Sequence, residues 1–250
     1  MKKQENKYGL SRRIPEDVKQ KIRADCGFGC VICGLGIYEY EHVDPEFNDA
    51  KVHDPSKMTL LCSQHHSKVT RKMLSKETVK DAMLRPCALQ KGFASETFDI
   101  SPQESITITI GNNNFEDVGA LIVIADMPIL QIRPPDVSGS QFLLSAKFFS
   151  SKNQISLQII DNEWMVSSGI WDVKTEGNTI TIREVKGKIH LQLIAVPPHA
   201  LIISRINMFF KGFLISGDDK KISFRRPSGK ERLIVGGNSF AHLPVAINIE

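Results

Sequence analysis

The sequence predicts a mixed α+β protein, with the helices in a small N-terminal region and β-strands throughout a larger C-terminal region. Three observations support this class. Helical patterns with start and stop signals occur before residue 86. Short runs that alternate β-branched and polar residues begin near residue 98. Four of the five cysteines lie before residue 63. We therefore expect one domain at residues 1–90, a second at residues 98–250 and a boundary near residues 87–98.

Short elements fill the N-terminal region. Pro15 begins an amphipathic helix, two glycines follow its end, and Ser75 is placed to cap a later helix. Helices are expected at residues 15–25, 64–72 and 76–84, and strands at 37–43 and 58–62. A polar loop joins the two strands at residues 45–56. So small a region can bury little apolar surface, so it would need a metal to hold it together.

Two pairs of metal-binding side chains lie in this region. Cys30 and Cys33 are separated by two residues, and so are Cys62 and His65. Two such pairs of thiolate and imidazole ligands are the usual layout of a closed tetrahedral zinc site, because one turn can present both members of a pair. We predict a structural Zn²⁺ bound by Cys30, Cys33, Cys62 and His65. His66 could replace His65 as the fourth ligand, and the sequence leaves this choice open.

Charge and cysteine usage limit the class of protein further. Residues 1–90 contain 16 Lys and Arg against 12 Asp and Glu, whereas residues 91–250 contain 16 of each, so the net charge of +4 belongs to the N-terminal region. An excess of cations is expected where a protein meets phosphates. The sequence shows no signal peptide and no membrane-spanning stretch, and clustered cysteines favour a reducing compartment. A cytoplasmic protein with no membrane partner is expected.

Further residues surround the predicted zinc ligands. Glu41-His42 ends the first predicted strand, and His66 follows the second ligand pair. Together these residues resemble the HNH family of ββα-metal endonucleases, in the version with an embedded zinc knuckle. In that family, a strand that ends in an acidic residue or His plus a second His leads through a loop and another strand to a helix with a metal-binding His. The resemblance covers residues 15–75 and rests on Cys30-x-x-Cys33, Glu41-His42, Leu60-Leu61-Cys62 and His66.

The resemblance implies a metal-dependent endonuclease that hydrolyses phosphodiester bonds, with DNA as the partner and defence against foreign DNA as one biological setting. His42 would be the general base, because an imidazole with a pKa near 6.5 can accept a proton from water at neutral pH. Glu41 and His66 would hold a catalytic Mg²⁺ or Mn²⁺, which neutralises charge on the scissile phosphate. The alternative interpretation is that Glu41 is a solvated carboxylate on the strand.

The chain departs from the family pattern at two positions. Cys62-x-x-His65 replaces the second cysteine pair, which zinc chemistry tolerates. Lys57 stands where the family has an asparagine that orients the base or assists the metal, and a charged lysine can neither accept a hydrogen bond nor coordinate. Three residues of the loop could take over this role: Asn48, His53 and Asp54.

Strand geometry adds a condition to this site. On a regular strand Glu41 and His42 point to opposite faces, so both reach one phosphate only if the strand bends at its end. A bend is expected at residues 43–45, because Pro45 restricts its own backbone and that of the preceding residue.

Basic residues follow His66 on the predicted helix. Lys68, Arg71 and Lys72 are candidates to bind nucleic-acid phosphates on either side of the cut. A solvated helix face is the alternative interpretation. Arg12 and Arg13 are further candidates on a weaker basis, and nothing in the sequence indicates readout of base edges.

The C-terminal region is predicted to be an all-β domain. Its clearest strand patterns lie at residues 106–110, 155–160, 179–182 and 188–193, and Gly-Asn and Asp-Asn turn signals separate them. A sandwich is the first choice and a solenoid the second, because no fixed repeat period is visible. Trp164 and Trp171 are expected to pack in its core or rim, and His190, Asp126 and Asp172 form no recognisable triad. A role in targeting, sensing or assembly is expected, with a homo-oligomer through this domain as one outcome.

Two other classes of protein fit the same residues. In one, the zinc-stabilised ββα unit is a non-catalytic module that binds nucleic acid or protein, and Lys57 marks a degenerate active site. In the other, the chain is an assembly protein dominated by residues 98–250.

Overall fold

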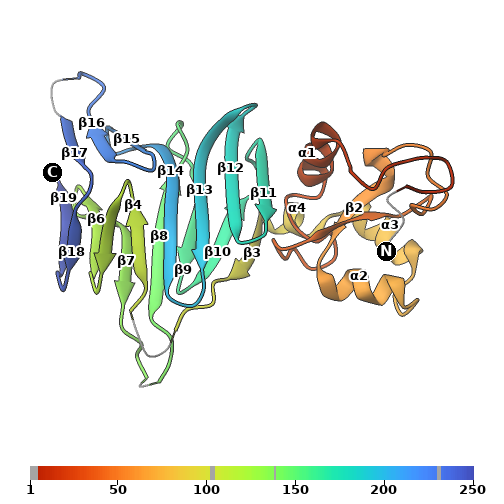
Figure 1. Ribbon diagram of the computed structural model, residues 1–250, viewed down its shortest axis with the longest axis horizontal. Coiled ribbons are helices and arrows are strands. Elements are labelled where there is room, and N and C mark those ends of the chain that lie inside the picture. The colour runs from red at the N-terminus through yellow and green to blue at the C-terminus, as the bar shows by residue number, and fades with distance from the viewer. Residues whose placement is uncertain (1–4, 102–104, 138, 230–231) are drawn as a thin grey trace. The chain divides into compact units, whose positions relative to one another are not determined.

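The computed structural model describes residues 5–101, 105–137, 139–229 and 232–250 (Figure 1). The chain forms two compact units. Unit 1 runs to Glu96 and also contains the segment Ser167–Thr175, whereas unit 2 contains Thr97–Val166 and Glu176–Glu250. Strands predominate over helices in the described residues, so the predicted mixed α+β class is confirmed at that level.

Unit 1 combines short helices with a two-stranded hairpin. The helices are α1 (Glu16–Asp25), α2 (Ser63–Thr70), α3 (Lys76–Leu84) and α4 (Cys87–Lys91), with a 3₁₀ turn η1 (Pro55–Lys57). The strands are β1 (Glu39–His42) and β2 (Met58–Leu61), and β3 (Phe93–Thr97) follows at the boundary with unit 2. Helix α4 was not predicted from the sequence. Pro15 precedes α1 and the Ser75 hydroxyl caps α3 by accepting from Thr78 N.

The hairpin and α2 together make a β-β-α arrangement. β1 pairs antiparallel with β2 without a register shift, from Glu39 opposite Leu61 to His42 opposite Met58. Because successive strand residues point to opposite faces, Glu39 and Glu41 share one face of β1 and His42 lies on the other. Cys62 directly follows β2 and occupies the N-cap position of α2.

The core of unit 1 gathers apolar side chains from α1, the hairpin, α2 and α3. Its buried members are Ile22, Cys26, Cys30, Val31, Val43, Met58, Leu60, Leu61, Cys62, Val69 and Val79. Cys26 behaves as the small buried residue expected from its isolated position. Its thiol contacts Thr59 Oγ1 at 3.4 Å, and burial raises its pKa to about 11.

A buried ion pair ties the segment Ser167–Thr175 into unit 1. Arg23 Nε donates to Asp172 Oδ1 at 2.8 Å, and both side chains are at most 3% exposed. The guanidinium also donates to Tyr40 Oη and Glu16 Oε1. Although burial opposes the charge, the bonds to Asp172 and Tyr40 raise the pKa of Arg23 above its ordinary value. A residue 149 positions further along the chain therefore completes the core of unit 1.

Unit 2 is built from strands. In chain order they are β4 (Thr107–Ile110), β5 (Asn113–Glu116), β6 (Ala120–Ile124), β7 (Met127–Arg133), β8 (Leu143–Phe149), β9 (Ile155–Ile160), β10 (Glu163–Ser167), β12 (Thr179–Val185), β13 (Lys188–Val196), β14 (Ala200–Phe210), β15 (Phe213–Gly217), β16 (Ile222–Arg225), β17 (Arg232–Val235), β18 (Ser239–Ala241) and β19 (Val245–Ile249). Strand β11 (Asp172–Glu176) lies at the boundary with unit 1.

These strands form two sheets in contact with each other. One has the order β19-β6-β7-β8-β9-β10 and the other the order β12-β13-β14-β15-β16-β17, while β4 pairs with the first half of β14 (Figure 1). Phe149 of the first sheet stacks on Phe210 of the second, with ring centroids 4.3 Å apart. Trp164 is buried against Phe98, as expected for a core residue. Within the described ranges, no helix is both long and apolar enough to cross a bilayer.

Candidate functional site

A tight turn presents the first pair of predicted ligands. In the segment from Cys30 to Gly34, Gly34 N donates to Cys30 O at 2.7 Å, and Gly34 has a positive φ of +83°. A Cβ atom on Gly29 would lie 2.6 Å from Gly34 O, so the close approach of these two backbone segments requires glycine. Cys33 lies on this turn, and Cys30 N donates to Leu35 O at 2.8 Å.

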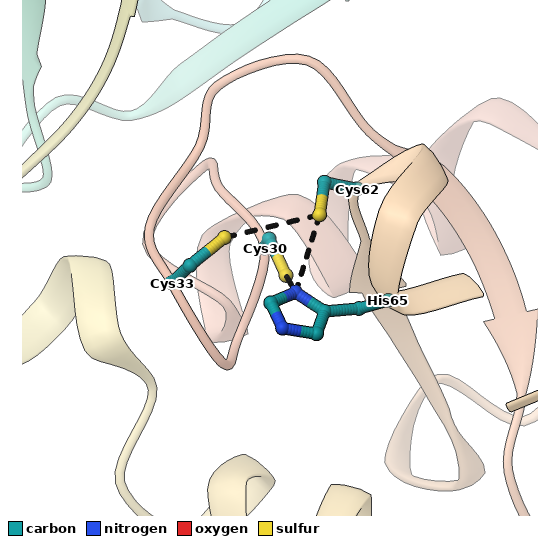
Figure 2. Close-up of side chains that lie close together, drawn as sticks. All are labelled: Cys30, Cys33, Cys62 and His65. Atoms are coloured by element: carbon teal, nitrogen blue, oxygen red, sulfur yellow. Dashed lines mark hydrogen bonds between the residues drawn. The ribbon is translucent and has the colours of Figure 1, made fainter. Parts of the chain in front are cut away.

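The structure brings Cys30, Cys33, Cys62 and His65 together, with their ligand atoms within 4.8 Å of one another (Figure 2). Cys33 Sγ and Cys62 Sγ are 3.8 Å apart, and His65 Nδ1 lies 3.2 Å from Cys62 Sγ and 3.5 Å from Cys30 Sγ. Tetrahedral zinc with Zn–S near 2.3 Å and Zn–N near 2.0 Å would separate its ligands by roughly 3.8 Å between sulfurs and roughly 3.5 Å between sulfur and nitrogen. The cluster therefore could hold a metal ion such as zinc.

Binding of a cation at this cluster would require the thiols to lose their protons. Burial raises the pKa of Cys33 to about 12, and the neighbouring Cys30 acts in the same direction. Burial, followed by the charge of Lys68, lowers the pKa of His65. Thiolates and a neutral imidazole are the forms that bind zinc, so metal binding here would release protons and depend on pH. Among the described residues, this is the group of His, Cys, Asp and Glu that meets the geometry of a metal site.

His66 lies apart from the sulfurs and faces β1 instead. Its Nε2 is 3.2 Å from Glu41 Oε2, and its Nδ1 is 3.6 Å from Glu39 Oε2. Lys76, the first residue of α3, donates from Nζ to Glu41 Oε1 and also to His42 O at 2.9 Å. A carboxylate beside an imidazole is a ligand pair for a divalent cation, and here an ammonium already balances the carboxylate charge. No local pattern pointed to Lys76 as a site residue, because its contact with Glu41 depends on the packing of α3.

His42 lies on the opposite face of β1 and is 9% exposed. Its Nε2 is 3.0 Å from His53 Nδ1, and His53 Nε2 is 2.8 Å from Ser11 O. A carbonyl can only accept, so His53 carries its proton on Nε2 and presents a bare Nδ1 to His42. His42 must then carry its proton on Nε2, which leaves Nδ1 as its basic nitrogen. Burial, then the charges of His53 and Lys76, lowers the pKa of His42 to about 4, so the ring is neutral at pH 7.

Two of the loop residues that could replace the family's asparagine, His53 and Asp54, form side-chain hydrogen bonds. Of these substitutes, His53 contacts His42, whereas Asp54 caps η1 by accepting from Ser56 N. Lys57 is exposed and lines a cavity of about 450 Å³ with Met58 and Lys80. β1 stays regular through His42, and a cis Asp44–Pro45 peptide follows it. Glu41 and His42 therefore remain on opposite faces of the strand.

The basic residues after His66 do not share one face of α2. Lys68 lies three residues after His65 and therefore on the side of the sulfur cluster, as its effect on the His65 pKa also indicates. Arg71 is the C-cap of α2, and Lys72 follows with a positive φ of +61°. In the part of the chain that the structure describes, none of the three forms an ion pair with a carboxylate. Arg12 lies over the Phe47 ring at 4.4 Å, and Phe47 packs edge-on against His42.

Comparison of the chain with protein-family models, with curated proteins and with solved structures finds no match. A functional assignment must therefore rest on the residues and geometry of the site itself.

Proposed function

We propose that this chain is a metal-dependent endonuclease of the HNH class, which hydrolyses phosphodiester bonds in DNA. One observation carries the proposal. The β1–β2 hairpin and α2 bring Glu41 Oε2 to 3.2 Å from His66 Nε2. The residue after Glu41 is His42, whose tautomer leaves Nδ1 able to accept a proton. The Cys30–Cys33–Cys62–His65 cluster lies at the start of the same helix.

We propose a structural role for Zn²⁺ at the sulfur cluster. Four protein ligands fill the coordination of tetrahedral zinc, so such an ion has no open position for substrate or water. Its contribution would be to join the Cys30 turn to the start of α2. Because His66 directly follows His65, this junction would also fix the position of His66.

In the proposed reaction, Glu41 and His66 would hold Mg²⁺ or Mn²⁺. When bound, such a cation neutralises charge on the scissile phosphate and makes a coordinated water more acidic. His42 would be the general base, and its Nδ1, which the hydrogen bond to His53 leaves without a proton, would take the proton from the attacking water. His53 holds the His42 ring and its tautomer, in the role that the family gives to asparagine. Lys76 contacts both the Glu41 carboxylate and the His42 carbonyl, so its charge lies beside both residues at the end of β1.

The substrate class follows from charge. Lys68, Arg71 and Lys72 carry positive charge that no carboxylate among the described residues neutralises. Such cations bind the nucleic-acid backbone without reading sequence. We therefore expect binding that weakens steeply as salt concentration rises and cleavage with little sequence preference from unit 1.

Nicking of supercoiled plasmid by the full chain tests the proposal. With Mg²⁺ or Mn²⁺ the wild type should nick DNA, and His42→Ala should reduce the rate by a factor of roughly 100 or more, as expected for loss of a general base. Zinc content should stay unchanged in that variant. His242→Ala, which changes an exposed histidine of unit 2, is the matched control and should nick at the wild-type rate. Equal behaviour of wild type and His42→Ala across several metals would reject catalysis by this site.

A second candidate is a zinc-stabilised module that binds nucleic acid without cutting it. The ion pair of Lys76 with Glu41 favours this function, because the ammonium takes the place of a cation at the carboxylate. Lys76→Met distinguishes the two. If the carboxylate belongs to a cation site, the variant should bind Mn²⁺ more tightly than the wild type, by roughly tenfold, since a competing charge is removed. An unchanged Mn²⁺ affinity together with retained DNA binding would support the binding module.

A further inference from the structure

A groove on unit 2 has the size and chemistry of a ligand site. Its volume is about 430 Å³, within the range of small-molecule pockets. Strands β13, β14, β15 and β16 form its floor, and Ser151 and Glu184 stand at one side. All of its lining residues belong to unit 2, so the groove is independent of the site in unit 1.

Two neighbouring rows of side chains cross the floor. In the first row Phe209 pairs with Leu214, which pairs with Arg225. Residues directly opposite each other on paired strands project from the same face, so this row offers an apolar surface that ends in a guanidinium. In the second row Asn207 pairs with Ser216, which pairs with Ser223, and these supply amide and hydroxyl groups.

Two cations of the groove have no carboxylate partner among the described residues. Arg225 and Lys188 both line the groove and are exposed, and neither forms an ion pair within the described ranges. The carboxylate of the groove, Glu184, is already held. It accepts from Ser151 N at 2.8 Å and from the Ser151 hydroxyl, and it lies 3.1 Å from His190 Nδ1.

The buried side of the groove is fixed by hydrogen bonds. His190 Nε2 lies 2.9 Å from Ser156 Oγ, and His190 Nδ1 lies against Glu184. This order of serine, histidine and carboxylate resembles a nucleophilic triad. However, Ser156 has no exposed surface and also donates to Phe148 O, so no substrate reaches its hydroxyl. The three residues therefore hold the wall of the groove in place, and their arrangement does not support hydrolysis.

We propose that this groove binds a small organic anion, with its acidic group on Arg225 and its apolar part on Phe209 and Leu214. A planar guanidinium pairs with phosphate or carboxylate through two hydrogen bonds. Lys188 adds a second cation from β13, and Ser216 and Ser223 offer hydrogen bonds to polar substituents. The ligand class is thus a phosphate or carboxylate attached to a ring or chain, of about mononucleotide size or smaller.

Calorimetric titration of the full chain tests this proposal. The probes are phenyl phosphate, benzoate and AMP, each compared with a neutral counterpart, phenol for the first two and adenosine for the third. At least one acidic probe should bind at millimolar concentration or below, and more tightly than its neutral counterpart. Comparison of the affinities for phenyl phosphate and benzoate shows whether the groove prefers a phosphate or a carboxylate.

Variants of the groove complete the test. Arg225→Gln and Lys188→Gln should each weaken binding of the acidic probe, by about tenfold or more for the arginine, since a charge-assisted hydrogen bond is lost. Lys186→Gln removes an exposed cation of the same β-hairpin that does not line the groove, and should bind as the wild type does. Unchanged near-ultraviolet circular dichroism confirms that the variants fold. Absence of binding by every acidic probe, equal binding of the neutral counterparts, or unchanged affinity of Arg225→Gln would each overturn the proposal.

Discussion

Unit 1 joins short helices and four-residue strands, and its core residues include Cys30 and Cys62 of the sulfur cluster. Unit 2, by contrast, pairs strands of up to 11 residues and buries aliphatic and aromatic side chains along them. Unit 1 contains the buried Arg23–Asp172 ion pair, whereas the buried side chains of His190 and Ser156 form a hydrogen bond between the two sheets of unit 2. Unit 1 thus places the thiols of a possible metal site and a buried ion pair in its small core, whereas unit 2 fills its core with apolar side chains from long paired strands.

Each unit contains one of the two tryptophans of the chain. Trp171 belongs to unit 1 and is 37% exposed, whereas Trp164 belongs to unit 2 and is 2% exposed. Trp164→Phe and Trp171→Phe therefore give chains in which fluorescence reports on one unit at a time. These two backgrounds allow the comparison to be tested directly.

The largest effect is expected from loss of the sulfur cluster. Cys62→Ser should release zinc and unfold unit 1 while unit 2 stays folded, because structural zinc contributes roughly 10 kcal/mol or more to small domains. Thermal unfolding followed by Trp171 should then lose its cooperative transition, and that followed by Trp164 should keep it.

Cys87→Ser is the control for this change, because Cys87 is half-buried and lies outside the cluster. It should keep both transitions and the full zinc content. If Cys62→Ser also kept a cooperative unit 1, metal would not be what stabilises that unit.

The buried ion pair should have the next largest effect. Asp172→Ala leaves the Arg23 guanidinium buried without its main partner, which costs about 3–5 kcal/mol. Urea unfolding monitored through Trp171 measures this loss. Asp49→Ala removes a carboxylate from an exposed pair with Lys7 in the same unit and should change stability by less than about 1 kcal/mol. If Asp172→Ala cost as little stability as this control, the segment Ser167–Thr175 would not be needed for the stability of unit 1.

A substitution that creates a cavity in the apolar core tests the comparison in unit 2. Leu157 of β9 has no exposed surface, so Leu157→Ala should destabilise unit 2 by roughly 2–5 kcal/mol. Urea unfolding in the Trp171→Phe background measures the change. The zinc content should be unaffected, and so should the Trp171 transition, followed in the Trp164→Phe background. Joint loss of both transitions would mean that the units unfold together.

The smallest effect is a dependence of unit 2 on pH. Burial lowers the pKa of His190 below its ordinary value near 6.5, although Glu184, the carboxylate that faces it, opposes this shift. The folded state thus favours the neutral ring, so this contribution to stability is complete above about pH 6.5 and is lost as pH falls towards the folded pKa. Urea unfolding followed by Trp164 from pH 7 to pH 5 should show the decline. His190→Gln should flatten it, and an equal slope in that variant would assign the decline to other groups.

Local patterns predicted much of the fold. The residues that begin and end α1 and α3 were visible in the sequence, because Pro15 and Ser75 act on backbone groups within one turn. The runs at residues 155–160 and 179–182 correspond to β9 and to the start of β12. Helix α4 was missed, since its five residues are too few to show a helical period.

Spacing in the sequence determined that two ligand pairs could each lie on one turn, and that Glu41 and His42 would occupy opposite faces of a regular strand. Tertiary structure decided which atoms meet. It placed His65 on the sulfurs and His66 on Glu41, because adjacent helix residues point about 100° apart and only the packing of α2 on the hairpin selects between them. It also joined Arg23 to Asp172, a contact that depends on the path of the chain through unit 2 and that no local pattern encodes.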